Sequence, residues 1–189
     1  MLKPFYQGKL DTFCAIYAVL NALRLTHGIR TLKARVILNE TLVALAASPE
    51  AFKMVLDQET DYVQLVDGIL SAQGKVFPLE AHSPFARGEN PGSEYLWNYC
   101  REWFAGGAPR AIVFRFLRSL TPGAAPVNRH WTTADRMDDD ILHLFDCSHE
   151  AEAVLNIRKN SFVTRPEDIS KDRLLCIQPS SMRFLRVPF

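Results

Sequence analysis

One stretch near the N-terminus decides the fold: Gln7-Gly8-Lys9-Leu10-Asp11-Thr12-Phe13-Cys14-Ala15-Ile16-Tyr17-Ala18-Val19-Leu20-Asn21-Ala22. The pattern predicts a helix over residues 13–25, with Asp11 or Thr12 as its N-cap and Gly28 just past its end. This helix is apolar on nearly every face for its first turns, which is typical of a helix buried inside a domain. We therefore expect it to be the central helix of the fold.

Cys14 stands at the start of this helix. Free N–H groups and a partial positive charge at a helix N-terminus favour the thiolate, the nucleophilic form of cysteine. A structural role is the other interpretation, because free cysteines are among the most buried residues. Gln7 favours the reactive one, because a tight loop containing Gly8 would fold its amide back to form an oxyanion hole with the Cys14 N–H. A surface glutamine before a turn is the alternative.

A thiolate also needs a base, and the chain offers five histidines: His27, His82, His130, His143 and His149. His130 begins a predicted strand, and Asp146 ends the next one. If the hairpin between them has an odd-numbered loop centred on Asp138, the two residues pair directly and face the same way. An even loop would place Asp146 on the opposite face. The alternatives are a half-buried strand histidine and a turn aspartate.

The rest of the chain changes from helices to strands. Helices are expected at 33–47 and from Ser93 to Gly106. Another helix is expected to begin after an N-cap at Ser48, with Pro49 as its first residue, and a further one to run from an N-cap at Thr60 to Gln73. Strands are expected at 75–79, 111–117, 130–136, 141–147, 161–164, 174–178 and 183–187. This order predicts one α+β domain over 1–189, with a helical half at about 1–107 and an antiparallel sheet half at about 108–189.

Composition narrows the function classes. The chain has 189 residues, 22 Lys and Arg against 21 Asp and Glu, and a net charge of +1, so the basic excess of a nucleic-acid binder is missing. We find no stretch long enough for a membrane span and no signal-peptide pattern, and expect a protein that is cytoplasmic as made, with signal-less export as an option. The cysteines Cys14, Cys100, Cys147 and Cys176 are widely spaced, so free thiols are expected.

Residues 7–22 resemble the glutamine-to-cysteine segment of papain-like cysteine peptidases. The His130-Trp131 strand, followed sixteen residues later by Asp146, resembles their histidine strand and third member. The compact start is more similar to bacterial leader peptidases and injected effector proteases than to papain. The chain departs from the family pattern in three ways: it lacks Cys-Gly-Ser-Cys-Trp, its Gln7-to-Cys14 spacing is one residue longer than usual, and its third member is Asp rather than Asn.

The resemblance implies a papain-like fold and a set of roles. Cys14 would be the nucleophile, His130 the general base and acid, Asp146 its orienter, and Gln7 the oxyanion donor. The implied activity is hydrolysis of a peptide or isopeptide bond in a peptide or protein substrate, without a metal or organic cofactor. A protein partner for delivery or inhibition is an option. The alternatives are a thiol-dependent acyltransferase or transglutaminase using the same triad, and an inactive papain-like binding module.

Other residues support weaker hypotheses. His143, Cys147 and His149 would share one face only if the strand continued through Ser148, so a zinc site there is the minor alternative. Cys147 is also a poorer candidate nucleophile, because it lies in a strand. The aromatic stripe along residues 95–104 is better explained as core than as a substrate groove. The loops at 80–92 and 118–129 are expected to gate the site, and the second should border the cleft.

Overall fold

The computed structural model describes residues 2–8, 12–107, 109–148 and 154–188. The predicted α+β class is confirmed, because helices come first along the chain and pack on a mostly antiparallel sheet. The α-helices are α1 (Cys14–His27), α2 (Thr31–Ala46), α3 (Pro49–Leu56), α4 (Tyr62–Gly74) and α5 (Ser93–Phe104). The strands are β1 (Glu80–His82), β2 (Arg110–Arg118), β3 (Asn128–Met137), β4 (Ile141–Leu144), β5 (Asn156–Arg158), β6 (Phe162–Val163), β7 (Leu175–Ile177) and β8 (Arg183–Arg186). Short 3-10 turns occupy Pro166–Asp168 and Pro179–Ser181.

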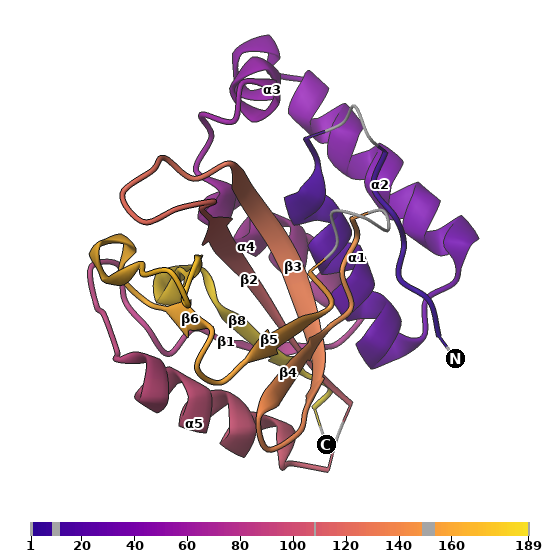
Figure 1. Ribbon diagram of the computed structural model, residues 1–189. Coiled ribbons are helices and arrows are strands. Elements are labelled where there is room, and N and C mark those ends of the chain that lie inside the picture. The colour runs from indigo at the N-terminus through magenta and orange to yellow at the C-terminus, as the bar shows by residue number, and fades with distance from the viewer. Residues whose placement is uncertain (1, 9–11, 108, 149–153, 189) are drawn as a thin grey trace.

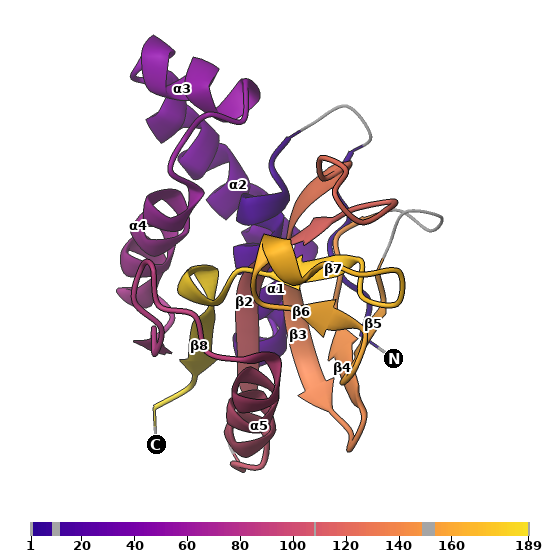
Figure 2. The ribbon, with the colours of Figure 1, turned by 60° about the vertical axis from the view of Figure 1, so that its left-hand side comes forward.

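The sheet has the strand order β1-β8-β2-β3-β4-β5, with β7 adding to β2 and β6 pairing with β7. All pairings are antiparallel except β6 with β7. Figure 1 shows β2 and β3 running through the middle of the molecule, and Figure 2 shows β8 beside them. No helix in the described ranges has both the length and the apolar character to cross a bilayer.

The two faces of the sheet carry separate cores because side chains alternate along β2. Ala111 and Val113 join the apolar core formed with α1, α2 and α4. Ile112, Phe114 and Phe116 join a second core with α5. Helices therefore cover both faces, with α5 across the sheet from α1 (Figure 1). The stripe along α5 is core, as expected, since its Leu96, Trp97 and Cys100 are buried.

The helix α1 lies between the sheet and the other N-terminal helices, as its sequence predicts (Figure 1). Its Ile16, Leu20 and Leu23 are at most 2% exposed, and each such side chain contributes about 2 kcal/mol on burial. The helix ends at Gly28 as predicted, where a left-handed backbone (φ 65°) places the Gly28 N–H on the Arg24 carbonyl at 3.0 Å.

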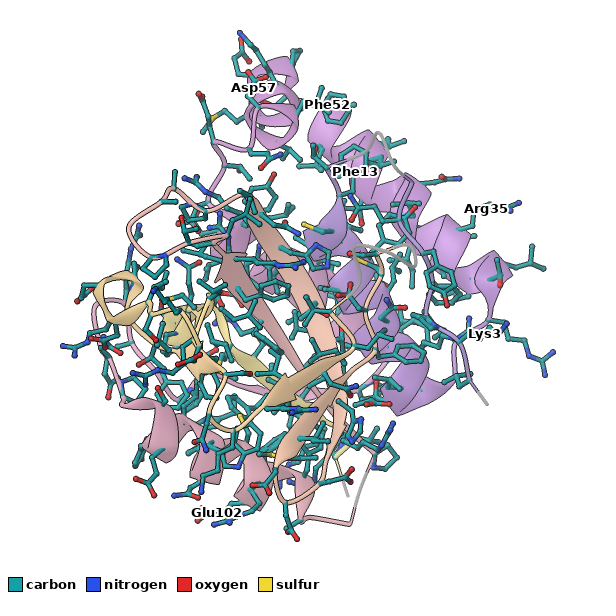
Figure 3. All side chains as sticks on the ribbon, in the orientation of Figure 1. Lys3, Phe13, Arg35, Phe52, Asp57 and Glu102 are labelled. Carbon is teal, nitrogen blue, oxygen red and sulfur yellow. The ribbon has the colours of Figure 1, made fainter. Side chains whose placement is uncertain are left out.

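The start of α1 differs from the prediction. Phe13, and neither of the residues proposed, occupies the N-cap position, and its side chain makes no capping hydrogen bond. Thr12 cannot cap because its hydroxyl donates to the Val55 carbonyl (3.4 Å) at the end of α3, and Asp11 lies outside the described residues. Phe13 stacks on Phe52 of α3 with ring centroids 6.4 Å apart (Figure 3). Tertiary contacts thus replace a local cap.

The predicted strand at 75–79 is wrong. The N–H groups of Val76 and Phe77 bond back to the Gln73 carbonyl at 2.9 and 2.8 Å, so the chain continues α4 as a turn. The strand β1 follows this turn and pairs with β8, inside the region expected to be only a loop. Residues that the apolar pattern assigned to a strand therefore form local hydrogen bonds with the end of α4 instead.

Three smaller features of the helices and strands also differ from the prediction. Asp61, not Thr60, caps α4, and its carboxylate accepts from the N–H groups of Val63 (3.1 Å) and Gln64 (3.3 Å). The strand β4 ends at Leu144, three residues before the predicted end. The short strand β5 was not expected. It is found by its pairing with β4, which a three-residue pattern does not reveal.

Asn21 ties α1 to two other segments. It is fully buried, and its side chain accepts from the Phe5 N–H at 2.7 Å and donates to the Phe5 carbonyl at 3.2 Å. The same amide donates to the Phe145 carbonyl at 3.5 Å. Phe5 lies two residues before Gln7, and Phe145 directly precedes Asp146. One side chain therefore anchors the segments that carry two of the predicted site residues.

We expect Asn21→Ala to lower the free energy of unfolding by about 2 kcal/mol, because it leaves buried backbone groups without partners. Urea unfolding measures this loss. Asn39→Ala is the matched control, since Asn39 is an exposed residue of α2, and it should change stability by less than about 0.5 kcal/mol. Equal effects of the two substitutions would contradict the anchoring role of Asn21.

Candidate active site

His130 lies near the start of β3, opposite Phe116 of β2. The two rings meet edge to face, with centroids 5.5 Å apart, and the histidine is 6% exposed. The backbone of β3 pairs with β2 from Asn128 to Ala134, and this pairing positions the imidazole.

His130 and Asp146 do not pair directly, which was the arrangement expected for an odd-numbered loop, and a bulge explains why the two side chains still meet. Near the turn, Met137 pairs with Leu142, a frame that would put Asp146 on the opposite face from His130. Asp135 is an extra residue in β3, so beyond it Ala134 pairs with Leu144. The Phe145 N–H then bonds to the Thr133 carbonyl at 2.7 Å. In this shifted register Asp146 becomes a diagonal, same-face neighbour of His130.

His130 and Asp146 form a buried pair. The ring Nε2 lies 2.7 Å from Oδ1 of Asp146, and the carboxylate is 2% exposed. The same Oδ1 accepts the Ser148 N–H at 2.9 Å, and the Ser148 hydroxyl lies 3.2 Å from Nε2. These contacts fix both the carboxylate and the orientation of the imidazole.

Cys14 is the first residue of α1 and is partly exposed. It lines a pocket of about 190 Å³ together with His130, Gln7 and Trp131. A side-chain hydrogen bond with Cys14 is among the causes that raise the pKa of His130. The other three cysteines are buried, so Cys14 is the cysteine that a substrate in this pocket can reach.

The electrostatics favour a protonated imidazole. Burial by itself lowers the pKa of His130, but hydrogen bonds with Asp146, Cys14 and Cys147, together with the Asp146 charge, outweigh burial and raise that pKa well above its ordinary value. A protonated His130 stabilises a thiolate beside it, since opposite charges attract strongly in a pocket with little water.

Cys147 lies behind the imidazole rather than in the pocket. It is 1% exposed, and its Sγ is 3.8 Å from His130 Nε2, 3.7 Å from Gln7 Oε1 and 4.0 Å from the Trp131 carbonyl. Burial raises the pKa of the Cys147 thiol to about 11, so it stays protonated near neutral pH. Its backbone carbonyl also accepts the Gln7 N–H at 2.8 Å.

The structure therefore brings together all four predicted site residues. Gln7, Cys14 and His130 line one pocket, and Asp146 holds His130 from behind. The predicted loop at 118–129 contributes Val127, Asn128 and Arg129 to the same pocket. Sequence reasoning did not anticipate Tyr62 and Arg115, which also line it, or the contacts of Cys147 and Ser148 with the histidine.

The weaker zinc hypothesis finds no support in the described geometry. His143 is engaged with Asp138 at 2.6 Å and Arg136 at 3.1 Å, and His149 lies outside the described residues. His130, Asp146 and Cys147 do cluster, with ligand atoms within 4.8 Å of one another. The 2.7 Å between His130 and Asp146 is a hydrogen bond, whereas two tetrahedral zinc ligands lie about 3.4 Å apart.

No protein-family model matches the sequence, and a search of curated proteins finds none similar to it. The function is therefore inferred from the residues of the site and their geometry.

We expect Asp146→Asn to destabilise the protein in a pH-dependent way. Because the folded-state pKa of His130 is raised, its contribution is fully present below about pH 6.5 and is lost as pH rises through the folded-state pKa. The substitution should lower the free energy of unfolding by about 3 kcal/mol near pH 6 and by less at alkaline pH. Urea unfolding over a pH series measures both.

Asp138→Asn is the matched control, because Asp138 holds His143 at 2.6 Å on the surface, with the carboxylate side chain 63% exposed. This exposed pair should contribute less than about 1 kcal/mol. A loss for Asp146→Asn that is equally small, or that does not change with pH, would contradict the raised pKa of His130.

Proposed function

We propose that this chain is a papain-like thiol hydrolase that cleaves a peptide or isopeptide bond. The observation that carries the proposal is one arrangement: the thiol of Cys14 at a helix N-terminus, the imidazole of His130 in the same pocket, and the carboxylate of Asp146 on the Nε2 side of that ring. A nucleophile, a base beside it and a group that orients the base form the general pattern of an activated cysteine.

Cys14 is the better nucleophile of the two cysteines near His130. Its thiol faces the pocket, whereas Cys147 is buried and its raised pKa keeps it protonated. Cys147 also approaches the same ring nitrogen, Nε2, that Asp146 occupies. With Nε2 held by the carboxylate, Nδ1 is the ring nitrogen that exchanges a proton with Cys14.

The reaction follows from these positions. The Cys14 thiolate attacks the substrate carbonyl carbon, and the C=O electron pair moves onto oxygen. Protonated His130 gives its proton to the leaving amine as the C–N bond breaks, which leaves a thioester on Cys14. Neutral His130 then takes a proton from water, the hydroxide attacks the thioester, and the acid leaves as the thiol group is restored.

Gln7 and the start of α1 supply the oxyanion site. The Cys147 thiol contacts Oε1 of Gln7, and the Cys147 carbonyl holds its backbone, so the amide group has a fixed orientation beside the pocket. Phe13, at the N-cap of α1, makes no side-chain capping hydrogen bond, and its carbonyl accepts the N–H groups of Ile16 and Tyr17 rather than that of Cys14. An amide donor and a helix-start N–H suit a tetrahedral oxyanion.

Reaction with p-nitrophenyl acetate tests the proposal without a known substrate. We expect rapid nitrophenolate release and one acetyl group per chain, which peptide mass spectrometry places on Cys14. His130→Ala should slow acylation by about 10²- to 10⁴-fold, and Gln7→Ala by about 10²-fold. Cys176→Ala is the control, because Cys176 is buried at a distance from this pocket.

Two outcomes would contradict the role of Cys14 as the nucleophile. One is acylation no faster than that of free cysteine, which is the behaviour of an inactive binding module. The other is an acetyl group that stays after Cys14→Ala but disappears after Cys147→Ala. If an added primary amine such as glycinamide takes the acetyl group in preference to water, the same triad acts as an acyltransferase and the hydrolase proposal is wrong.

A further inference from the structure

The pocket at Cys14 has a one-sided charge. Among the described residues that line it, Arg115, Arg129 and His130 are basic, and none is an aspartate or a glutamate. Arg115 comes from β2, two residues beyond Val113, and so lies on the face that α1 and α4 cover. Arg129 immediately precedes His130 on β3.

Arg115 differs from the buried arginine that serves the fold. Arg183 is 5% exposed, and Asp67 neutralises it through contacts of 2.5 and 2.9 Å. Arg115 is half-buried, yet no described carboxylate pairs with it, and its buried Nε has no hydrogen-bond partner. Its guanidinium lies 5.9 Å from the centre of the Tyr62 ring. Burial, with the nearby Arg129 charge, lowers the pKa of Arg115, which reflects the cost of placing this cation there.

A second pocket of about 390 Å³ adjoins the first and shares Tyr62 and Arg115 with it. Its other charged lining residues are Glu59, Asp61 and Arg87, and Arg87 pairs with Asp61 at 3.8 Å. Arg115 therefore lines both pockets, and an anionic group of a ligand bound beside it is attracted to its guanidinium.

We propose that Arg115, supported by Arg129, binds a carboxylate of the substrate and so selects substrates with an acidic group next to the scissile bond. This inference rests on the proposed function and names its substrate class. A guanidinium binds a carboxylate through two parallel hydrogen bonds, and Arg115 lines the pocket with no carboxylate of the described residues paired to it. The carboxylate is either an acidic side chain or a C-terminus, because both offer the same two oxygens.

Two alkylating reagents that differ in charge test the inference. Iodoacetate carries a carboxylate and iodoacetamide a neutral amide, and in both cases the Cys14 thiolate displaces iodide. The readout is the ratio of the two rate constants at Cys14, located by peptide mass spectrometry. We expect Arg115→Gln to lower the iodoacetate-to-iodoacetamide ratio by about tenfold, Arg129→Gln to lower it less, and Arg115→Lys to restore part of it.

Arg118→Gln is the matched control, since Arg118 is an exposed residue of the same strand that does not line the pocket. It should leave the ratio unchanged. A ratio that is the same in wild type, Arg115→Gln and Arg129→Gln, with Cys14 still fast towards iodoacetamide, overturns the inference and leaves the proposed function standing. Slow reaction of wild-type Cys14 with both reagents overturns the proposed function and the inference with it.

Peptide libraries separate the two sources of carboxylate. One library contains Asp and Glu and has amidated C-termini, and the other lacks Asp and Glu and has free C-termini. Cleavage of the first alone assigns an acidic side chain, and cleavage of the second alone assigns a terminal carboxylate. Equal cleavage of a third library, amidated and without acidic residues, overturns the inference.

Discussion

The packing of α1 against β3 is the constraint on which the site depends. The Thr133 hydroxyl donates to the Ala18 carbonyl at 2.7 Å, one turn into α1, and Trp131 packs into the same core. These contacts fix the start of the helix beside His130. Asn21 then uses the same helix to hold the two segments that carry Gln7 and Asp146. A change in the position of α1 would therefore move Cys14 and the segments that carry Gln7 and Asp146 together.

The buried part of the site is neutralised, whereas the pocket carries positive charge. Asp146 is almost fully buried and neutralised by His130, and Cys147 fills the space behind the ring as a neutral thiol. The pocket itself is basic, with Arg115 and Arg129 facing the partly exposed Cys14. The buried carboxylate of Asp146 thus pairs with His130, while Arg115 and Arg129 have no carboxylate of the described residues in the pocket.

Sequence reasoning predicted α1, the change to strands and four candidate residues that lie together in the fold, because those signals are local. An apolar helix, a cysteine at its start and a β-branched strand pattern each occupy a short window. The bulge at Asp135 could not be predicted, because the sequence of residues 128–146 does not show which residue stays unpaired. Cys147 and Arg115 were missed for a related reason. Their contacts with Gln7 and Tyr62 join positions far apart in the chain, and only the packed sheet brings them together.

The proposed function depends on Cys14, rather than Cys147, as the reactive thiol beside His130. Ultraviolet absorbance of thiolates over a pH series, recorded for wild type, Cys14→Ala and Cys147→Ala, tests this dependence most directly. We predict that the first thiolate to appear as the pH rises is lost in Cys14→Ala and remains in Cys147→Ala. A first thiolate that remains in Cys14→Ala and is lost only in Cys147→Ala would contradict the proposed function.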